Sequence, residues 1–562
     1  MKIIIFKFFL IFFTLYHSEI YSKTTDEKNF NHRYLSNYFS ALISYDNNRN
    51  KDALKYFNFS KQLLNEHEKF LEEYVFSLVE DGQVSKAIKQ IKLSKNLKNS
   101  NFFEANLLMA VDSLKKGNYL NSLEYVSLMK NFQDDGTYEY IIFETLESYA
   151  KLFINKEISD ENDEKFGKLS LITRAFQTCY LNSNLTDSYF INLINSPKGE
   201  YSRYLFFYLA NLIEKKNYNE AKQLVENVDP IGSSLIISQA KNWVTESKFE
   251  NFNQFFSCKS ENDILAEFFF LIANLYSSQD EFLSSNFYLN ISNYLNPKFY
   301  FNLTLLAENY YLNENYNLTR KILNKFDNKH EVYEWYKIKR IAQIVKEQKG
   351  TEKFLLYIEN KFKKINNPNP KILFDMATIY KNNKKFKKAI KYYTEVLSKI
   401  EKNSESFADT IYRRGGSYER MGIYDMADKD LLKSLEISPE EPYVLNYLAY
   451  SWLERKYKIN EAIEMLQRAY KLKKNDPYII DSVGWGYYLI GDYIRAEKYL
   501  VKAVQLMPDD PIVNDHYADI LWKLNRKLQA KYFWENVLEM EDAEEEMKKN
   551  IVEKLIKGLD ET

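Results

Sequence analysis

The stretch PYIIDSVGWGYYLIGDYIRAEKYLVKAVQLMPDD, residues 477–510, places small residues among large apolar ones at fixed intervals. With Pro477 as position 1, glycine occupies positions 8 and 15, and alanine occupies positions 20 and 27. Tyrosine or leucine stands at positions 11, 17 and 24, and proline stands at position 32. The stretch contains no His and no Cys, so its pattern points to packing rather than to a reaction.

The same pattern recurs along the C-terminal part of the chain. Stretches begin 34 residues apart at 408 and 442 and at 477 and 511, and the stretch from 442 has one extra residue in its turn. The stretch from Ala408 repeats the glycines at Gly415 and Gly422, and the alanine at Ala427. Three further stretches carry alanines at the corresponding places. These are Ala377 and Ala389 in the stretch from 370, Ala449 and Ala462 in the stretch from 442, and Ala518 and Ala530 in the stretch from 511. Self-similarity at this period indicates a solenoid of repeated helix pairs.

The small residues have a physical role in such a fold. At positions 8, 20 and 27 neighbouring helices cross closely, and a larger side chain would separate them. Gly491 and Gly422 lie at position 15, where a left-handed backbone ends the first helix of a pair. Pro508 and Pro439 at position 32 end the second helix or precede the next one.

This pattern resembles the tetratricopeptide repeat, a unit of two antiparallel helices. The resemblance is greatest over residues 370–544, lower over 34–128 and 266–325, and slight elsewhere. It implies an all-α, α-α superhelical solenoid of about ten helix pairs, some of them degenerate. The expected domains are 1–22, a signal peptide; 23–133, an N-terminal array; 134–369, a central region clearest at 266–325; 370–544, a C-terminal array; and 545–562, a polar capping helix or tail.

The chain begins with MKIIIFKFFLIFFTLYHSEIYSK, a basic start followed by an apolar run from Ile3 to Tyr16. The run is too short to span a bilayer, and Ser22 supplies a small residue for cleavage. We therefore expect a secretory signal and an exported protein of the bacterial periplasm or cell envelope, with an uncleaved anchor as the alternative. In that setting Cys179 and Cys258 either pair or remain as two buried thiols.

Composition excludes several function classes. The net charge is −1 and the isoelectric point about 6.6, which gives no general attraction for nucleic acid. The five histidines are scattered, His516 is expected at the surface or in the groove, and neither metal-ligand nor nucleophile motifs occur. The sequence therefore predicts no enzyme, no cofactor and no metal. Membrane association is expected only through partners or an uncleaved signal.

A closer resemblance concerns residues 445–504 and 516–538. Asp481-Ser482 before Gly484-Trp485, and Asp519 to Trp522 before Ala530 and Trp534, are similar to the C-terminal units of bacterial exported tetratricopeptide proteins. Some of those are lipoproteins that serve as adaptors for a carboxyl-terminal processing protease. The resemblance implies a non-catalytic scaffold or adaptor that binds other proteins, such as an envelope protease or hydrolase. The alternatives are a structural subunit of an envelope assembly or secretion complex, and an enzyme with an unrecognised site.

Positions 2, 5, 9, 12 and 13 of the first helix line the concave groove in such repeats. Repeats that hold acidic tails carry Lys, Asn and Arg at fixed positions there, and this chain does not follow that pattern. It instead mixes aromatic and polar residues, which are typical of protein interfaces. The predicted partner-binding residues are Tyr412, Arg420, Asn446, Tyr450, Asp481, Trp485, Tyr488, Asp519 and Trp522.

Overall fold

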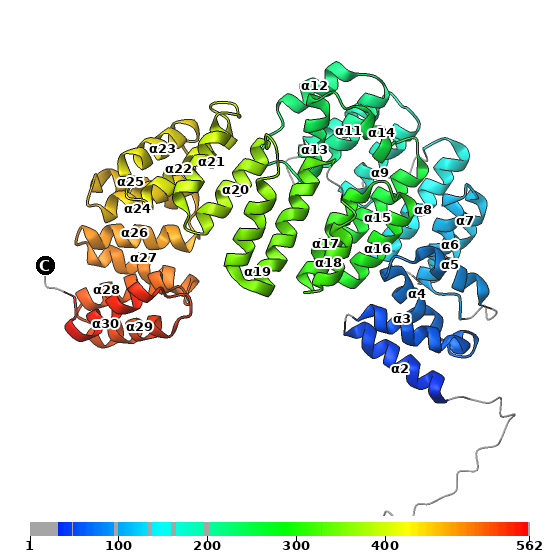
Figure 1. Ribbon diagram of the computed structural model, residues 1–562, viewed down its shortest axis with the longest axis horizontal. Coiled ribbons are helices and arrows are strands. Elements are labelled where there is room, and N and C mark those ends of the chain that lie inside the picture. The colour runs from blue at the N-terminus through cyan, green and yellow to red at the C-terminus, as the bar shows by residue number, and fades with distance from the viewer. Residues whose placement is uncertain are drawn as a thin grey trace, which may run out of the picture. The chain divides into compact units, whose positions relative to one another are not determined.

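The computed structural model describes residues 32–47, 49–94, 99–132, 134, 136–158, 165–195, 203–326 and 329–559 (Figure 1). These residues form 29 α-helices and three short 3-10 helices, and they contain no strand. The all-α fold that the 34-residue period predicts is therefore confirmed. The predicted signal peptide, residues 1–22, lies outside the described residues.

The chain divides into two compact units that alternate along the sequence. Unit 1 comprises residues 1–199 and 250–326, and unit 2 comprises 200–249 and 327–562. The predicted N-terminal array falls within unit 1 and the predicted C-terminal array within unit 2. The central region 134–369 is shared between the two units.

Unit 1 consists of short helices connected by tight turns. Its elements are α2 (His32–Asp46), α3 (Asn50–Phe59), η1 (Lys61–Asn65), α4 (Phe70–Glu80), α5 (Val84–Leu93), α6 (Phe103–Lys115), α7 (Tyr119–Met129), η2 (Lys130–Phe132), α8 (Tyr138–Asn155), α9 (Lys168–Tyr180), α10 (Thr186–Ile194), α14 (Glu250–Phe255), α15 (Glu261–Ser277), α16 (Phe282–Leu295), η3 (Tyr300–Asn302), α17 (Leu303–Leu312) and α18 (Tyr316–Leu323).

Unit 2 joins three helices from the middle of the chain to the C-terminal array. Its elements are α11 (Arg203–Glu214), α12 (Tyr218–Glu226), α13 (Leu235–Thr245), α19 (Glu331–Phe362, with a kink at Gly350), α20 (Pro370–Asn382), α21 (Phe386–Leu397), α22 (Glu405–Glu419), α23 (Tyr424–Ile437), α24 (Pro442–Glu454), α25 (Ile459–Leu472), α26 (Pro477–Leu489), α27 (Tyr493–Leu506), α28 (Pro511–Lys523), α29 (Lys527–Glu539) and α30 (Glu545–Lys557).

Helices α20 to α29 form antiparallel pairs stacked in chain order (Figure 1). Proline opens α20, α24, α26 and α28, where its missing N–H is not needed. The Asp476 carboxylate accepts hydrogen bonds from the amides of Tyr478 and Ile479, at 3.1 and 3.2 Å. Asp510 caps α28 in the same way. These caps start α26 and α28 in the same register.

The small residues lie where the helices cross, as the sequence predicts. A Cβ atom built on Gly484 would lie 2.6 Å from Cγ of Leu500 on the partner helix. Ala496 and Ala503 on α27 are fully buried, and Ala427 on α23 is nearly so. Side chains larger than these would force the paired helices apart.

The glycines at position 15 have the backbone conformation expected of them. Gly491 has φ +81° and Gly422 has φ +71°, which side-chain-bearing residues rarely adopt. The amide of Asp492 donates to the carbonyl of Tyr487, 2.9 Å away, and closes the end of α26. This turn therefore reverses the chain within three residues between Leu489 and Tyr493.

In unit 1 the helices α15 and α16 pack against the N-terminal helix pairs of the same unit. Helix α16 contacts α4 and α5, and α15 contacts α6. The Asn290 side chain donates to the carbonyl of Glu80 at 3.2 Å, and the Tyr276 hydroxyl donates to Glu139 at 3.3 Å. The rings of Phe76 and Phe287 lie 5.0 Å apart. The chain's own helices thus cover one side of α4 to α8.

A disulfide joins Cys179 at the end of α9 to Cys258 after α14. The two residues are 79 positions apart in the sequence, and their Cα atoms are 5.7 Å apart. The bond lies within unit 1 and connects the segment before residues 200–249 with the segment after them. The sequence left open whether these cysteines pair, and the structure pairs them.

Candidate functional site

A cavity of about 1020 Å³ lies between α20, α22, the end of α23 with the loop that follows it, and the start of α24. It is larger than most small-molecule sites and has the open form of a groove. Its walls mix aromatic, acidic and basic side chains. The lining residues are Lys381, Glu405, Ala408, Asp409, Tyr412, Arg413, Ser434, Ser438, Pro439, Glu440, Glu441, Tyr443 and Val444.

Tyr412 is half-buried in this cavity, and its ring meets that of Tyr447 edge-on at 5.9 Å. Burial raises the pKa of the Tyr412 hydroxyl, so it stays protonated at neutral pH. Beside it the Asp409 carboxylate accepts two hydrogen bonds from Nε of Arg413, at 3.0 and 2.9 Å. The cavity therefore combines a fixed aromatic wall with an ion pair at its floor.

Further along the array, aromatic residues of α24 and α26 gather beside one another. The ring of Trp485 stacks on Tyr488 at 4.6 Å and on the His516 imidazole at 4.0 Å. Its Nε1 donates to the Glu454 carboxylate at 2.7 Å. Burial raises the pKa of Tyr450, and the carboxylates of Glu454 and Asp481 raise it further. Trp485 is thus held by three neighbours within the chain.

Behind these rings lies a buried cluster of charged residues on α26, α28 and α30. His516 Nδ1 lies 2.8 Å from the Asp481 carboxylate, and both side chains are over nine-tenths buried. Lys554 of α30 contacts Asp515 at 2.6 Å and Asp519 at 2.8 Å. The Nε1 atom of Trp534, the residue at position 24 of the last pair, donates to the same two carboxylates at 3.0 Å.

The pKa values of the two cations in this cluster follow from their neighbours. Burial alone would lower the pKa of His516, but the carboxylates of Asp481, Asp515 and Asp519 outweigh burial and raise it. Burial likewise opposes the charge of Lys554, and Asp519 and Asp515 again raise its pKa. Both groups are therefore stabilised in their charged forms.

Helix α30 closes the end of the array. A Cβ atom on Gly558, just after α30, would clash with the indole of Trp522, so this chain segment covers that ring. Ile551 of α30 is fully buried. At its start, Glu544 lies 2.8 Å from Nζ of Lys384, in the turn between α20 and α21. The C-terminal helix thus takes the place that the next repeat would occupy.

The structure separates the nine predicted site residues into groups. Tyr412 lines the cavity, and Arg420 is exposed at the end of α22. Asp481 and Asp519 are 5% and 4% exposed and contact other charged groups of the chain. The remaining five are half-buried, namely Asn446, Tyr450, Trp485, Tyr488 and Trp522.

The sequence does not predict the roles of several residues in this region. The sequence predicts His516 at the surface or in the groove, and it is instead 6% exposed and paired. Lys381 and Arg413 of the cavity fall at positions 12 and 6 of their repeats. Lys554 belongs to a tail rich in lysine and glutamate, and no sequence pattern distinguishes it from the other lysines there. Of these, only Lys381 carries a usable signal, since position 12 is one of the positions expected to line the groove.

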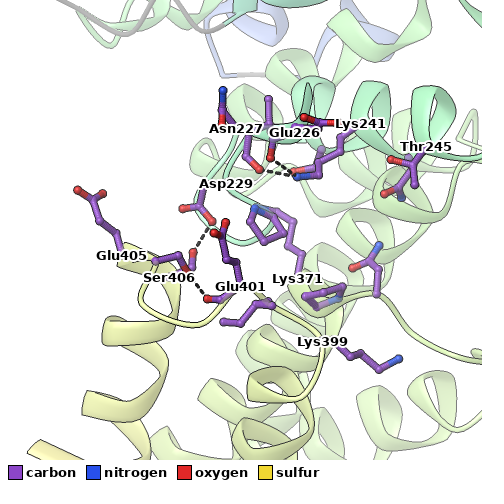
Figure 2. Close-up of a pocket in the computed structure, with 18 of the residues that line it drawn as sticks. Glu226, Asn227, Asp229, Lys241, Thr245, Lys371, Lys399, Glu401, Glu405 and Ser406 are labelled. Atoms are coloured by element: carbon purple, nitrogen blue, oxygen red, sulfur yellow. Dashed lines mark hydrogen bonds between the residues drawn. The ribbon is translucent and has the colours of Figure 1, made fainter. Parts of the chain in front are cut away.

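A second cavity of about 540 Å³ lies where the α12–α13 loop meets α20 and the start of α22 (Figure 2). Its lysines serve the chain itself: Lys371 donates to the carbonyls of Ile231 and Ser233, and Lys241 to that of Val228. The Ser406 hydroxyl points to Asp229 and donates to it. These contacts attach residues 226–246 to the C-terminal array.

The described part of the chain contains neither a metal-binding cluster nor a membrane-spanning helix. No group of three or more His, Cys, Asp or Glu residues there is placed to hold a metal ion. None of the helices in that part has the length and apolar character needed to cross a membrane.

Comparison with known proteins agrees with this architecture. The tetratricopeptide repeat family model matches residues 370–398 and 408–441. A TPR repeat-containing protein of Pseudomonas aeruginosa is 34% identical over 102 residues, which are 18% of this chain and 17% of the relative. A lipoprotein NlpI homolog of Haemophilus influenzae is 27% identical over 119 residues, 21% of this chain and 37% of the relative.

The matches thus span well under half the length of these relatives. Among solved structures, a TPR protein of Thermus thermophilus covers 33% of this chain and 99% of its own, with 16% identity and a TM-score of 0.30. MamA of Desulfovibrio magneticus RS-1 covers 31% of this chain and 97% of its own, with 18% identity and a TM-score of 0.27. The chain therefore contains tetratricopeptide repeats, arranged in the all-α solenoid that its 34-residue period predicts.

Proposed function

We propose that this chain is a non-catalytic scaffold or adaptor that holds another protein in the groove of its C-terminal array. The observation that carries the proposal is the 1020 Å³ cavity beside Tyr412. In unit 1, by contrast, α4 and α6 already contact α16 and α15 of the same chain. Tetratricopeptide repeats generally mediate contacts between proteins, and an extended concave surface is how such arrays bind.

The groove residues have the chemistry of interface anchors. Tyr, Trp and Arg contribute most to binding when they meet a partner in a well-packed position. Tyr412 and Tyr450 are half-buried and therefore already restricted in conformation, while Arg420 is exposed nearby. Restricted aromatic side chains lose little conformational entropy when a partner binds.

The proposed location is the periplasm or cell envelope of a bacterium. The disulfide between Cys179 and Cys258 supports it, because such bonds persist in oxidising compartments outside the cytosol. The apolar N-terminal run and the likeness to an NlpI-type lipoprotein point the same way. In the finer form of the proposal, the partner is an envelope protease or hydrolase.

The test combines Tyr412→Ala with Tyr450→Ala and measures capture of the native partner after cross-linking in the envelope. If both tyrosines are anchors, each substitution should remove about 2–4 kcal/mol of binding free energy, which weakens binding roughly thirty- to a thousandfold. Tyr532→Ala is the matched control, since Tyr532 is 67% exposed on α29, a second helix of its pair. Circular dichroism should show an unchanged helix content for all three substitutions.

The identity of the captured partner distinguishes an adaptor from a structural subunit. A captured protease or hydrolase supports the adaptor, whereas a multi-subunit membrane complex supports a structural subunit. Wild-type capture by the folded double variant would refute the groove as the binding site.

Export makes a separate prediction. If the segment ending at Ser22 is a cleaved signal, mass spectrometry of the native protein should find an N-terminus near Lys23. Soluble cytoplasmic protein that retains Met1 would contradict the proposed location.

A further inference from the structure

The turns of the C-terminal array separate its charged residues by sign. The first helices of successive pairs contact one another, as α22 does α24 and α24 does α26. The turns within pairs therefore lie along one edge of the array, and the turns between pairs lie along the other. The within-pair edge comprises residues 382–387, 419–425, 454–460, 489–494 and 523–528. The between-pair edge comprises residues 397–406, 437–443, 472–478, 506–512 and 539–546.

The two edges carry opposite net charge. The within-pair edge holds ten Lys or Arg residues and four Asp or Glu residues, whereas the between-pair edge holds four and thirteen. Lys385 and Lys456 of the within-pair edge are exposed and form no ion pair within the described part of the chain. The basic residues of this edge that do pair with carboxylates of the chain include Lys384, Arg455 and Arg526. An excess of positive charge thus faces solvent along one edge, and an excess of negative charge along the other.

Both edges also expose apolar side chains beside these charges. On the within-pair edge Ile494 is 73% exposed and Leu528 is 86% exposed. On the between-pair edge Tyr478 is 55% exposed and Ile512 is 52% exposed. Exposed apolar side chains surrounded by polar ones are typical of surfaces that bind another protein. Each edge therefore has the composition of an interface, and the two edges differ in the sign of their charge.

The chain itself brings the two edges together at one place. Nζ of Lys384, on the within-pair edge, lies 2.8 Å from the Glu544 carboxylate, on the between-pair edge, although the two residues are 160 positions apart. Both side chains are largely exposed, so this ion pair contributes little to stability. The acidic segment after the last pair nevertheless already lies against a basic turn of α20 and α21.

We propose that the between-pair edge of one copy binds the within-pair edge of a second copy, so that the protein self-associates head to tail. Opposite charges meet in this arrangement, whereas two like edges repel each other. The interface is heterologous because its two sides differ, and a pair of copies leaves one edge of each sign unoccupied. This surface is separate from the cavity beside Tyr412, and the inference does not depend on the proposed function.

Sedimentation velocity of the full chain, over a range of protein and salt concentrations, measures this self-association. We expect the mean mass to rise with protein concentration at low ionic strength. The mass should fall toward that of the monomer as added salt screens the charges. Both trends are read on the wild-type protein, so a variant that misfolds does not remove the test.

Two triple variants remove charge from one edge each. The within-pair variant is Lys385→Gln, Lys456→Gln and Lys527→Gln, and the between-pair variant is Asp509→Asn, Glu541→Gln and Asp542→Asn, all at exposed positions. Each variant alone should self-associate about tenfold or more weakly than wild type, because three charged contacts are lost. The matched control is Lys391→Gln, Lys429→Gln and Lys498→Gln, at exposed positions within the second helices α21, α23 and α27, and it should associate like wild type.

A mixture of the two triple variants identifies the arrangement. The within-pair variant keeps its acidic edge and the between-pair variant keeps its basic edge, so these two edges should bind with wild-type affinity. The complex should contain two copies and grow no further, since both of its remaining edges lack the removed charges. A dimer built on two equal surfaces would show no such recovery in the mixture.

Three results would overturn the inference. The first is wild-type protein that stays monomeric at low salt, including the case in which its basic edge binds vesicles of phosphatidylglycerol and phosphatidylcholine instead. The second is a control variant that loses as much association as the within-pair variant. The third is a mixture of the two triple variants that associates no better than either variant alone.

Discussion

At the scale of single residues, the stability of the array depends most on positions where the packing leaves no room for a larger side chain. Ala496 has no exposed surface, and its helix crosses α26, where Gly484 already lies against Leu500. Protein interiors are packed as densely as molecular crystals, so neighbours can move only slightly to admit extra atoms. Small residues at these crossings therefore fix the distance between paired helices.

Ala496→Leu should lower the free energy of unfolding by about 1–3 kcal/mol, because the additional carbon atoms must fit into a filled crossing. Urea denaturation followed by circular dichroism measures the loss. Lys498→Leu, outside the buried face of the same helix, should change stability by less than about 0.5 kcal/mol. Equal stability of both variants would show that the assigned repeat register is wrong.

His516 gives the array a stability that depends on pH. Its pKa is raised by Asp481, Asp515 and Asp519, so folding favours the protonated imidazole. This stabilisation is complete below the unfolded pKa of about 6.5 and is lost as pH rises through the higher folded value. His516→Gln should therefore lower stability by about 1.5–3 kcal/mol in mildly acidic buffer and by less at alkaline pH.

Urea unfolding of the wild-type protein and of His516→Gln, from mildly acidic to alkaline pH, measures this difference in stability. His32→Gln, at the exposed start of α2, serves as the control and should show no such trend. A difference between wild type and His516→Gln that grows with pH would contradict the assigned charge state.

At the scale of elements, α30 does more than shield the end of a solenoid. Lys554 neutralises Asp515 and Asp519, of which Asp519 is nearly inaccessible to water. An unpaired carboxylate in such a place is strongly disfavoured. The helix therefore supplies the counter-charge for α28, and the residue that follows it covers Trp522.

Lys554→Met should lower the free energy of unfolding by about 2–4 kcal/mol, the value for a broken buried ion pair reduced for its partial exposure. Lys557→Met on the same helix breaks an exposed pair with Glu553 and should have an effect below about 1 kcal/mol. Adding Asp519→Asn to Lys554→Met should recover part of the loss. If the two lysine variants are equally stable, α30 does not act through its charge.

The sequence predicted some elements well and others not at all, for a physical reason. Helices α20 to α29 are local: prolines and Asp476 start them, and Gly491 or Gly422 reverses the chain. The 34-residue period predicts the packing of these helices because each one contacts the helices next to it in the sequence. The pairing of His516 with Asp481, the use of Lys554, and the packing of α16 on α4 join separate elements through side chains that follow no period.

The same distinction holds for the predicted binding residues. Their positions in the repeat correctly place them on the first helices, since that depends on helical geometry alone. Whether each remains accessible depends on what packs over it. Asp519 and Trp522 lie beside α30, while Tyr412 faces an open cavity. A single repeat contains no information about that difference.

At the scale of the whole molecule, the chain leaves unit 1 after residue 199 and returns to it at residue 250. The Cys179–Cys258 disulfide connects the two sides of this excursion. Closing a loop between residues 79 positions apart removes much freedom from the unfolded chain. The bond therefore stabilises the junction in unit 1 between the segment that ends at residue 199 and the segment that begins at residue 250, which are not consecutive in the sequence.

Reduction of the disulfide should lower the stability of unit 1 by about 2–5 kcal/mol. Thermal melting with and without dithiothreitol measures the effect. The double variant Cys179→Ser, Cys258→Ser should melt like the reduced protein and should not respond to the reductant. A wild-type melting temperature that is independent of reductant would show that the bond contributes nothing to stability.

The alternation of the two units also sets an order for the newly made chain. The partners of α4, namely α16 and its Asn290, leave the ribosome about two hundred residues after α4 itself. During that interval the inner side of α4 to α6 is uncovered and prone to wrong contacts. Likewise, residues 200–249 must wait for Lys371 and Ser406. A chain that crosses a membrane from its N-terminus would therefore expose this side of α4 to α6 until α15 and α16 follow.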